Sequence, residues 1–261
     1  MSPDATLGNR SVLRALSILE LLSHTESPVS LGQVARRLEL PKSSALSLLR
    51  ALAAKEFVIV DEYGGYALGV RSFEVGAAYL HAMTPVRAVE HALQGLTAAF
   101  GVTSHFAVLE NDEVIYLAKH DPTGPGLKLA SSLGARLPAR TTAVGKAQLA
   151  FLATSADFAD AELASELDVV RSRGYAVDDG ETAAGIRCVA APVFDSRGCC
   201  GAVGVSYLLE ERTVAEAMAE AVTSAAERTS NRLGGSRSAE RPRGPMQTGS
   251  ELEVTHKCQR P

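Results

Sequence analysis

The chain has 261 residues, of which 46% are hydrophobic and 21% charged, a composition typical of a soluble protein with one large or two smaller domains. No apolar run approaches the ~20 residues of a membrane helix, and the polar start from Met1 to Arg10 lacks the apolar core of a secretory signal. The net charge of −4 argues only weakly against nucleic acid as a partner.

The local patterns between residues 11 and 52 predict three helices. Apolar residues recur at helical spacing from 11 to 22. Ser30 and Gln33 then form the S-x-x-Q pattern of a capping box, which predicts the start of a second helix. Pro41 suits the first turn of a third helix, where its missing N–H costs nothing. The inward face of that third helix is predicted to be Ala45, Leu48, Leu49 and Leu52.

A β-hairpin is predicted directly after the third helix. Phe57 to Val60 is a β-branched run, and Gly64-Gly65 is the pair that a tight hairpin turn prefers before a returning strand at 66–68. Three helices and a hairpin are the order of a winged helix-turn-helix domain, which we place at 1–68. Residues 69–84 return to helical spacing and predict a linker helix.

Positive charge is concentrated on this helical region. Residues 31–55 contain five cations, Arg36, Arg37, Lys42, Arg50 and Lys55, against Glu39 alone. A phosphate-binding footprint is a local patch, so the whole-chain charge does not exclude one. An ordinary solvated face has the same composition, and charge alone leaves both interpretations open.

The outer face of the third helix favours contact with DNA. Lysine, arginine and hydroxyl side chains bond phosphates or base edges, and a leucine can contact a thymine methyl. Arginines on the preceding helix would hold the DNA backbone and set the register. The predicted DNA contacts are Arg36, Arg37, Lys42, Ser43, Ser44, Leu46, Ser47, Arg50 and Tyr66. The alternative is a polar face that meets only solvent.

The rest of the chain predicts a second, mixed domain at 85–234. Helices are expected at 86–100, 142–153, 160–172 and 214–233, and strands at 103–109, 114–119, 188–194 and 202–208. This order indicates an α+β fold with an antiparallel sheet. From 235 to 261 the chain is rich in Gly, Ser, Arg and Pro, which predicts a disordered tail.

Several residues of this domain suit a small ligand. The first N–H groups of the helix near Ala143 to Gly145 suit a carboxylate, and Arg140 and Lys146 would add charge, although either is equally a surface cation. Asp178 and Asp179 either contact a ligand or cap a helix expected at 180–186. Cys188 is expected to be buried and to face the pocket.

The sequence contains none of the common catalytic or metal-binding motifs that we considered. The chain has no GxSxG, HExxH or P-loop pattern, and its four cysteines form no CxxC pair. We therefore expect no catalytic residue, no metal and no cofactor. Reduced thiols are expected, in a cytoplasmic protein.

Three segments carry family-specific motifs. GGYALG spans 64–69, LPARTTAVGKAQLAFL spans 137–152, and RSRGYAVDDGETAAGIRCVAAPVFDSRGCCGAVGVS spans 171–206. Together, over residues 11–234, they resemble the IclR family of bacterial transcriptional regulators. The third helix departs from the family at Ser47, where relatives usually have Arg, and the pocket departs at Gly204, where some relatives have Ser.

The resemblance implies a winged helix-turn-helix domain, a linker helix and a GAF-like effector-binding domain. It implies operator DNA and a small organic effector as partners, commonly a carboxylic acid or aromatic compound, in a homodimer or a dimer of dimers. The expected effector set is Arg140, Ala143, Val144, Gly145, Asp178, Ile186, Cys188, Gly204 and Ser206. The predicted function is a ligand-responsive regulator, most often a repressor. The alternatives are a dimeric sensor with weak or lost DNA binding, and a cysteine-dependent enzyme.

Overall fold

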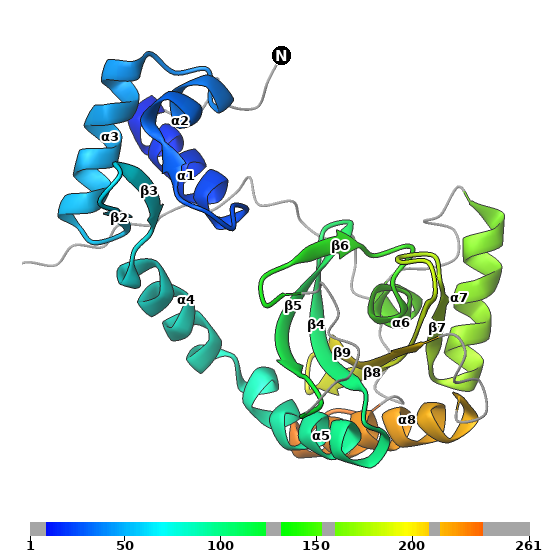
Figure 1. The fold of residues 1–261 in the computed structure, drawn as a ribbon. Coiled ribbons are helices and arrows are strands. Elements are labelled where there is room, and N and C mark those ends of the chain that lie inside the picture. Colours follow the sequence, from blue (N-terminus) through cyan, green and yellow to red (C-terminus); the bar gives the residue numbers. More distant parts are fainter. Residues whose placement is uncertain (1–8, 124–131, 153–159, 209–214, 237–261) are drawn as a thin grey trace, which may run out of the picture. The chain divides into compact units, whose positions relative to one another are not determined.

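The computed structural model describes residues 9–123, 132–152, 160–208 and 215–236, which fall into two units that divide after Ala82 (Figure 1). The first unit contains three helices, a small sheet and a fourth helix. Its helices are α1 (Arg10–Ser23), α2 (Leu31–Arg37), α3 (Lys42–Ala54) and α4 (Val70–Ala82). Its antiparallel strands, in the order β1-β3-β2, are β1 (Val29–Ser30), β2 (Val58–Val60) and β3 (Gly65–Leu68).

Local signals set the boundaries of α2 and α3. The capping box is formed, because Gln33 donates its N–H to the Ser30 hydroxyl and its side-chain oxygen accepts the Ser30 N–H at 2.9 Å. Pro41 directly precedes α3, as its sequence position predicts. The buried side chains Ile18, Val34, Ala45, Leu49 and Val58 then close the core between these elements.

The hairpin turn between β2 and β3 is held by one carboxylate. Asp61 Oδ1 accepts the N–H groups of Tyr63 at 2.9 Å and Gly65 at 2.7 Å. Gly64 has φ +79°, a left-handed conformation that glycine adopts without strain. Strand β1, which pairs with β3, was not predicted, because its two residues are too few to show a period.

The second unit is built on a six-stranded antiparallel sheet in the order β6-β5-β4-β9-β8-β7. The strands are β4 (Thr103–Glu110), β5 (Glu113–His120), β6 (Arg136–Pro138), β7 (Ala176–Asp179), β8 (Ile186–Asp195) and β9 (Gly198–Leu208). The helices are α5 (Thr84–Phe100), α6 (Ala143–Leu152), α7 (Ala161–Arg173) and α8 (Ala215–Arg232). Helices α5 and α8 cover one face of the sheet, and α6, backed by α7, covers the other (Figure 1).

Strands β6 and β7 were not predicted, and the helix expected at 180–186 is wrong. Residues 176–179 form β7, and a turn at 180–185 connects it to β8. At the other end, Gly234 bridges to Asp195, and Gly235 packs so closely that a Cβ there would lie 2.4 Å from the Phe194 carbonyl. The predicted tail beyond 236 lies outside the described residues.

Two surveys of the described residues bear on partners. None of the helices combines the length and apolarity needed to span a lipid bilayer. No group of three His, Cys, Asp or Glu side chains within the described ranges is placed to hold a metal ion.

Candidate nucleic-acid interface and small-molecule site

Helix α3 has one face in the core and one in solvent. Ala45 and Leu49 are fully buried, whereas Lys42, Ser43, Ser47 and Arg50 are exposed. Ser44 and Leu46 are half-buried at the border between these faces. The core contacts explain why the helix folds here, but they do not account for cations and hydroxyls gathered on the outer side.

The preceding helix, α2, adds two more exposed cations. Arg36 and Arg37 are exposed in the last turn of α2, and the chain then reverses through Glu39 at φ +51° before α3 begins. The arginines therefore lie close in sequence to Lys42, across a short turn. Cations at this turn and along α3 form a local positive surface on the helix-turn-helix.

Tyr66 does not belong to this surface. Its ring is only 9% exposed and packs in the core with α1, α2 and α3, because its position on β3 points inward. Tyr63, which is not among the predicted DNA contacts, is 89% exposed in the hairpin turn. The wing therefore presents Tyr63, and the Tyr66 side chain contributes to folding instead.

The second unit gathers polar side chains on the sheet face beneath α6. Asp178, Cys188, Ser206 and Thr103 are register partners across β7, β8, β9 and β4, so they share one face. The next row on that face contains Gly204 and His105. Both rows lie under helix α6, since its buried Ala143 and Ala147 pack in the same cluster as Ala190 and Ala202.

His105 connects these polar groups, and the sequence reasoning assigned it no role. Its Nε2 lies 3.0 Å from the Ser206 hydroxyl, which lies 3.0 Å from the Cys188 sulfur. The imidazole also makes an edge contact with the Tyr116 ring, with 5.2 Å between centroids. Among the described residues, His105 Nδ1 is buried and has no hydrogen-bond partner.

Burial keeps these side chains uncharged. Burial, helped by the charge on Lys119, lowers the pKa of His105 to about 4, and the ring is therefore neutral near pH 7. Burial raises the pKa of the Cys188 thiol to about 12 and moves the pKa of Tyr116 well above its usual range. A thiol that stays protonated is a poor nucleophile.

We expect the second unit to lose stability in mild acid through His105. An unfolded histidine binds a proton near pH 6.5 and the native one only near pH 4, so unfolding takes up a proton between these values. The free energy of unfolding should fall as the pH drops through this window, by about 3 kcal/mol in total. Urea unfolding at several pH values measures this. His105→Asn should weaken the pH dependence of the free energy of unfolding, whereas His24→Asn, at an exposed position, should not. Equal pH dependence in wild type and both variants would contradict the prediction.

Asp178 takes the capping role that the sequence left open, although it caps a turn and not a helix. Its Oδ1 accepts the N–H of Glu181 at 2.7 Å and of Thr182 at 3.3 Å, which holds the 180–185 turn beside the polar rows. Asp179 instead pairs with Arg187 across the strands. Ile186 and Cys188 are half-buried at the start of β8.

Lys146 is not a surface cation, because its side chain is buried and paired with two glutamates. Its side chain is 1% exposed, and Nζ binds Glu181 at 2.6 Å and Glu166 at 2.9 Å. Burial opposes the charge, but the two glutamates outweigh it, so the pKa of Lys146 lies above its ordinary value. Arg140, by contrast, has an exposed side chain. Lys146 therefore fastens the 180–185 turn to α6 and α7.

The start of α6 is already partly capped. The Gly145 N–H donates to the Thr142 hydroxyl at 3.2 Å, so it is not available to a carboxylate. Ala143 and Val144, the first two residues of α6, are buried in the core shared with the sheet. Among the expected ligand contacts, Gly145 thus has a structural role.

Gly145→Ala is expected to destabilise the second unit by about 1–3 kcal/mol, because a Cβ there would lie 2.1 Å from the Ala139 carbonyl oxygen. Urea unfolding measures the loss. Gly95→Ala on α5 is a matched control, since a Cβ at Gly95 meets nothing within 4 Å and alanine favours a helix. Equal stability of both variants would show that the backbone at Ala139 can move away from the added Cβ at almost no cost in free energy.

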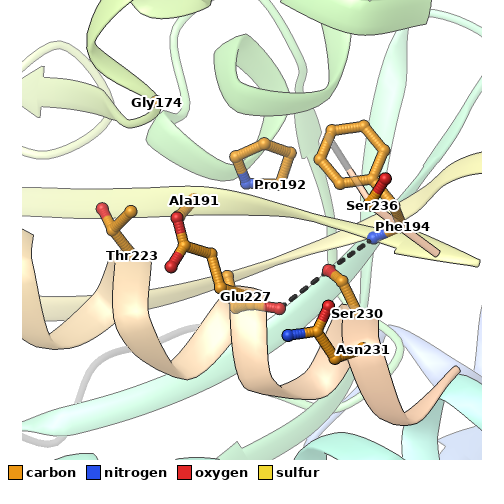
Figure 2. A pocket seen from close by; sticks show the side chains of 10 residues that line it. Gly174, Ala191, Pro192, Phe194, Thr223, Glu227, Ser230, Asn231 and Ser236 are labelled. Atoms are coloured by element: carbon orange, nitrogen blue, oxygen red, sulfur yellow. Dashed lines mark hydrogen bonds between the residues drawn. The ribbon is translucent and has the colours of Figure 1, made fainter. Parts of the chain in front are cut away.

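A separate hollow of about 220 Å³ lies between β8 and α8, on the opposite face of the sheet. Figure 2 shows Thr223, Glu227 and Asn231 on the helix beside the strand, and the rings of Pro192 and Phe194 on the other side of that strand. The Phe194 N–H donates to the Ser230 hydroxyl at 2.9 Å across it. None of the predicted effector residues lines this hollow.

The chain matches two family models in its two units. A model described as "IclR helix-turn-helix domain" matches residues 11–62. A model described as "Bacterial transcriptional regulator IclR C-terminal" matches residues 77–159 and 153–231. Together these matches cover most of the chain, in the order that the three sequence motifs predicted.

Curated relatives and solved structures are similar to this chain in agreement with the two family models. The regulator KdgR of Dickeya chrysanthemi is 30% identical over 206 residues, which cover 72% of this chain and 67% of KdgR. The repressor AllR of Escherichia coli K12 is 28% identical over 237 residues, which cover 82% and 87% of the two chains. An IclR homologue of Microbacterium hydrocarbonoxydans, crystallised with 4-hydroxybenzoate, shares the fold at 19% identity, with a TM-score of 0.77 over 87% of this chain and 100% of that one.

Proposed function

Because the chain belongs to the IclR family of bacterial transcriptional regulators, we propose that it is a repressor whose operator affinity responds to a small organic acid or aromatic compound. The observation that carries this proposal is the outer face of α3. Exposed Lys42, Ser43, Ser47 and Arg50 have no role in the core, and they are the residue types that bind phosphates and base edges. A repressor is the favoured form because AllR is named as one.

The proposed DNA contacts are the predicted set with one exception. Arg36 and Arg37 hold the phosphate backbone, and Lys42, Ser43, Ser44, Leu46, Ser47 and Arg50 approach the major groove. Exposed Tyr63 takes the place of Tyr66 on the wing. Since operator DNA is the partner, we place the protein in the cytoplasm.

A titration of the full chain against its own upstream DNA tests this function. Fluorescence anisotropy at several salt concentrations should show specific binding that weakens steeply as salt rises, since bound cations release counterions from DNA. Scrambled DNA of equal length is the control. Absence of binding at low salt, where phosphate contacts are strongest, would overturn DNA binding and favour a sensor that has lost it.

We further propose that the protein acts as a homodimer or a dimer of dimers. Large apolar side chains are exposed on two helices of the first unit, among them Val12 and Leu16 on α1 and Phe73 and Tyr79 on α4. Phe73 is 75% exposed, and clusters of this kind are typical of protein–protein contacts. Light scattering on the purified chain tests the state, and a monomer at micromolar concentration would overturn it.

The effector is proposed to bind on the polar face beneath α6. Asp178, Ile186, Cys188, Gly204 and Ser206 border this face, with Ala143 and Val144 above it. The uncharged thiol argues for ligand binding and against cysteine catalysis. Relatives are named regulators and repressors, so the chain is not an enzyme.

A further inference from the structure

The polar face contains one buried group without a partner. His105 is 1% exposed, and its Nδ1 has no hydrogen-bond partner among the described residues. Buried polar atoms in native proteins are almost always paired, so an orphaned one needs a reason. A ligand that completes the bond is such a reason.

The contacts of His105 determine which nitrogen carries the proton. Nε2 meets the Ser206 hydroxyl, and that hydroxyl also meets the Cys188 sulfur. A hydroxyl gains more by donating to an imidazole nitrogen than to sulfur, a weak acceptor, and a thiol is left to donate to the hydroxyl oxygen. The chain of donors therefore runs from Cys188 through Ser206 to Nε2. A neutral ring then carries its hydrogen on Nδ1, which makes the orphaned atom a donor.

The surroundings favour a negative group opposite that donor. Lys119 is the register partner of His105 on β5, and its charge helps to disfavour a proton on the ring. Lys119 is paired with Asp121 at 3.2 Å, and its charge still acts on His105. Asp178 is the buried carboxylate of the face, and two backbone N–H groups of its own turn occupy it. An acceptor with negative charge is thus better suited to His105 than a cation or a second donor.

Gly204 makes room for the ring. It lies opposite His105 on β9, and a Cβ at this position would come within 2.7 Å of His105 Cε1. The departure from the serine found in some relatives therefore permits the imidazole to lie where it does. The pair of Gly204 and His105 replaces a pocket hydroxyl with an imidazole N–H.

We propose that His105 determines effector specificity, by donating its Nδ1–H to the carboxylate of a small organic acid. The inference rests on the proposed function, because it concerns the effector site of that regulator. It narrows that ligand to a carboxylic acid and names the residue that recognises the carboxylate. A neutral ester of the same acid lacks the charge that Lys119 favours and binds less well.

Two substitutions separate the two ring nitrogens. His105→Asn places an amide nitrogen, a donor, near the former Nδ1, and His105→Gln can place its carbonyl oxygen near the former Nε2, where it accepts from the Ser206 hydroxyl. His105→Asn should retain carboxylate binding within a few-fold, whereas His105→Gln should keep the contact to Ser206 and lose affinity by about tenfold to a hundredfold, as expected for a hydrogen bond to a charged group. Calorimetry with the full chain measures both, using 4-hydroxybenzoate, benzoate and pyruvate as probes and their methyl esters as controls.

Several outcomes would overturn the proposal. Equal affinity of wild type and His105→Gln, tighter binding of esters than acids, or no binding by any of the three acids would each do so. Nitrogen-15 NMR of the ligand-free protein gives an independent readout: protonated Nδ1 is expected, and protonated Nε2 would overturn the donor assignment. Operator binding by the wild type is measured separately from acid binding, so a failure of the proposed regulator function would appear as absence of operator binding in the wild type, whatever the acid titrations show.

Discussion

Replacing Lys42 and Arg50 together with alanine is expected to weaken operator binding about a hundredfold to a thousandfold. Both side chains are exposed on the outer face of α3, and a base or phosphate contact of this kind contributes about 1–3 kcal/mol. Neither side chain supports the core, where Ala45 and Leu49 hold the helix. Anisotropy titrations against operator and scrambled DNA measure the loss, and the thermal midpoint should not change.

Controls separate a specific contact from a general change in charge. Arg87→Ala removes an exposed cation from α5 in the other unit and should leave DNA affinity within about twofold. Ser47→Arg should restore the side chain usual in relatives, tighten binding and steepen the salt dependence by about one counterion. If the double variant binds DNA like wild type, α3 is not the helix that contacts the operator. That result would favour the alternative, a sensor without DNA binding.

The first unit was largely predictable because its signals are local. The capping box spans four residues, the glycine pair lies within one turn, and the two faces of α3 follow from helical spacing alone. Tyr66 was wrongly predicted to be exposed, because the local sequence pattern does not show which face of the strand it occupies. A strand alternates its faces at every residue, so the inward or outward assignment of Tyr66 depends on pairing with β1 and β2, which the sequence does not display.

In the second unit the expected placement of Asp178, Cys188 and Ser206 close together is confirmed by the strand register, but the contacts around them were not predictable. His105 meets Ser206 across 101 residues of chain, and Lys146 meets Glu166 and Glu181 across 20 and 35 residues. No spacing rule connects such partners, so the histidine showed no role and the lysine resembled a surface charge. The short strands β6 and β7 were missed for the same reason, since pairing with distant strands defines them.

Lys146→Ala is expected to destabilise the second unit by about 3 kcal/mol. Removing one member of a buried ion cluster leaves its partners uncompensated, which typically costs about 3–5 kcal/mol. The lower end applies here because the side chains of Glu166 and Glu181 are 34% and 43% exposed and can be hydrated. Urea unfolding measures the loss. Hydrogen exchange at Glu181 and Thr182 should also rise, because the turn loses its tie to α6 and α7.

Two further variants test whether charge or volume is lost. Lys146→Met keeps the buried aliphatic stem and should lose less stability than Lys146→Ala. Exposed Lys55→Ala should be nearly neutral. A Lys146→Ala protein as stable as wild type would mean that the ion cluster contributes nothing net. Faster exchange in the turn at unchanged global stability would instead mean that Lys146 holds the turn beside the polar face beneath α6. If the effector binds there as we propose, the substitution would alter effector affinity without altering the fold.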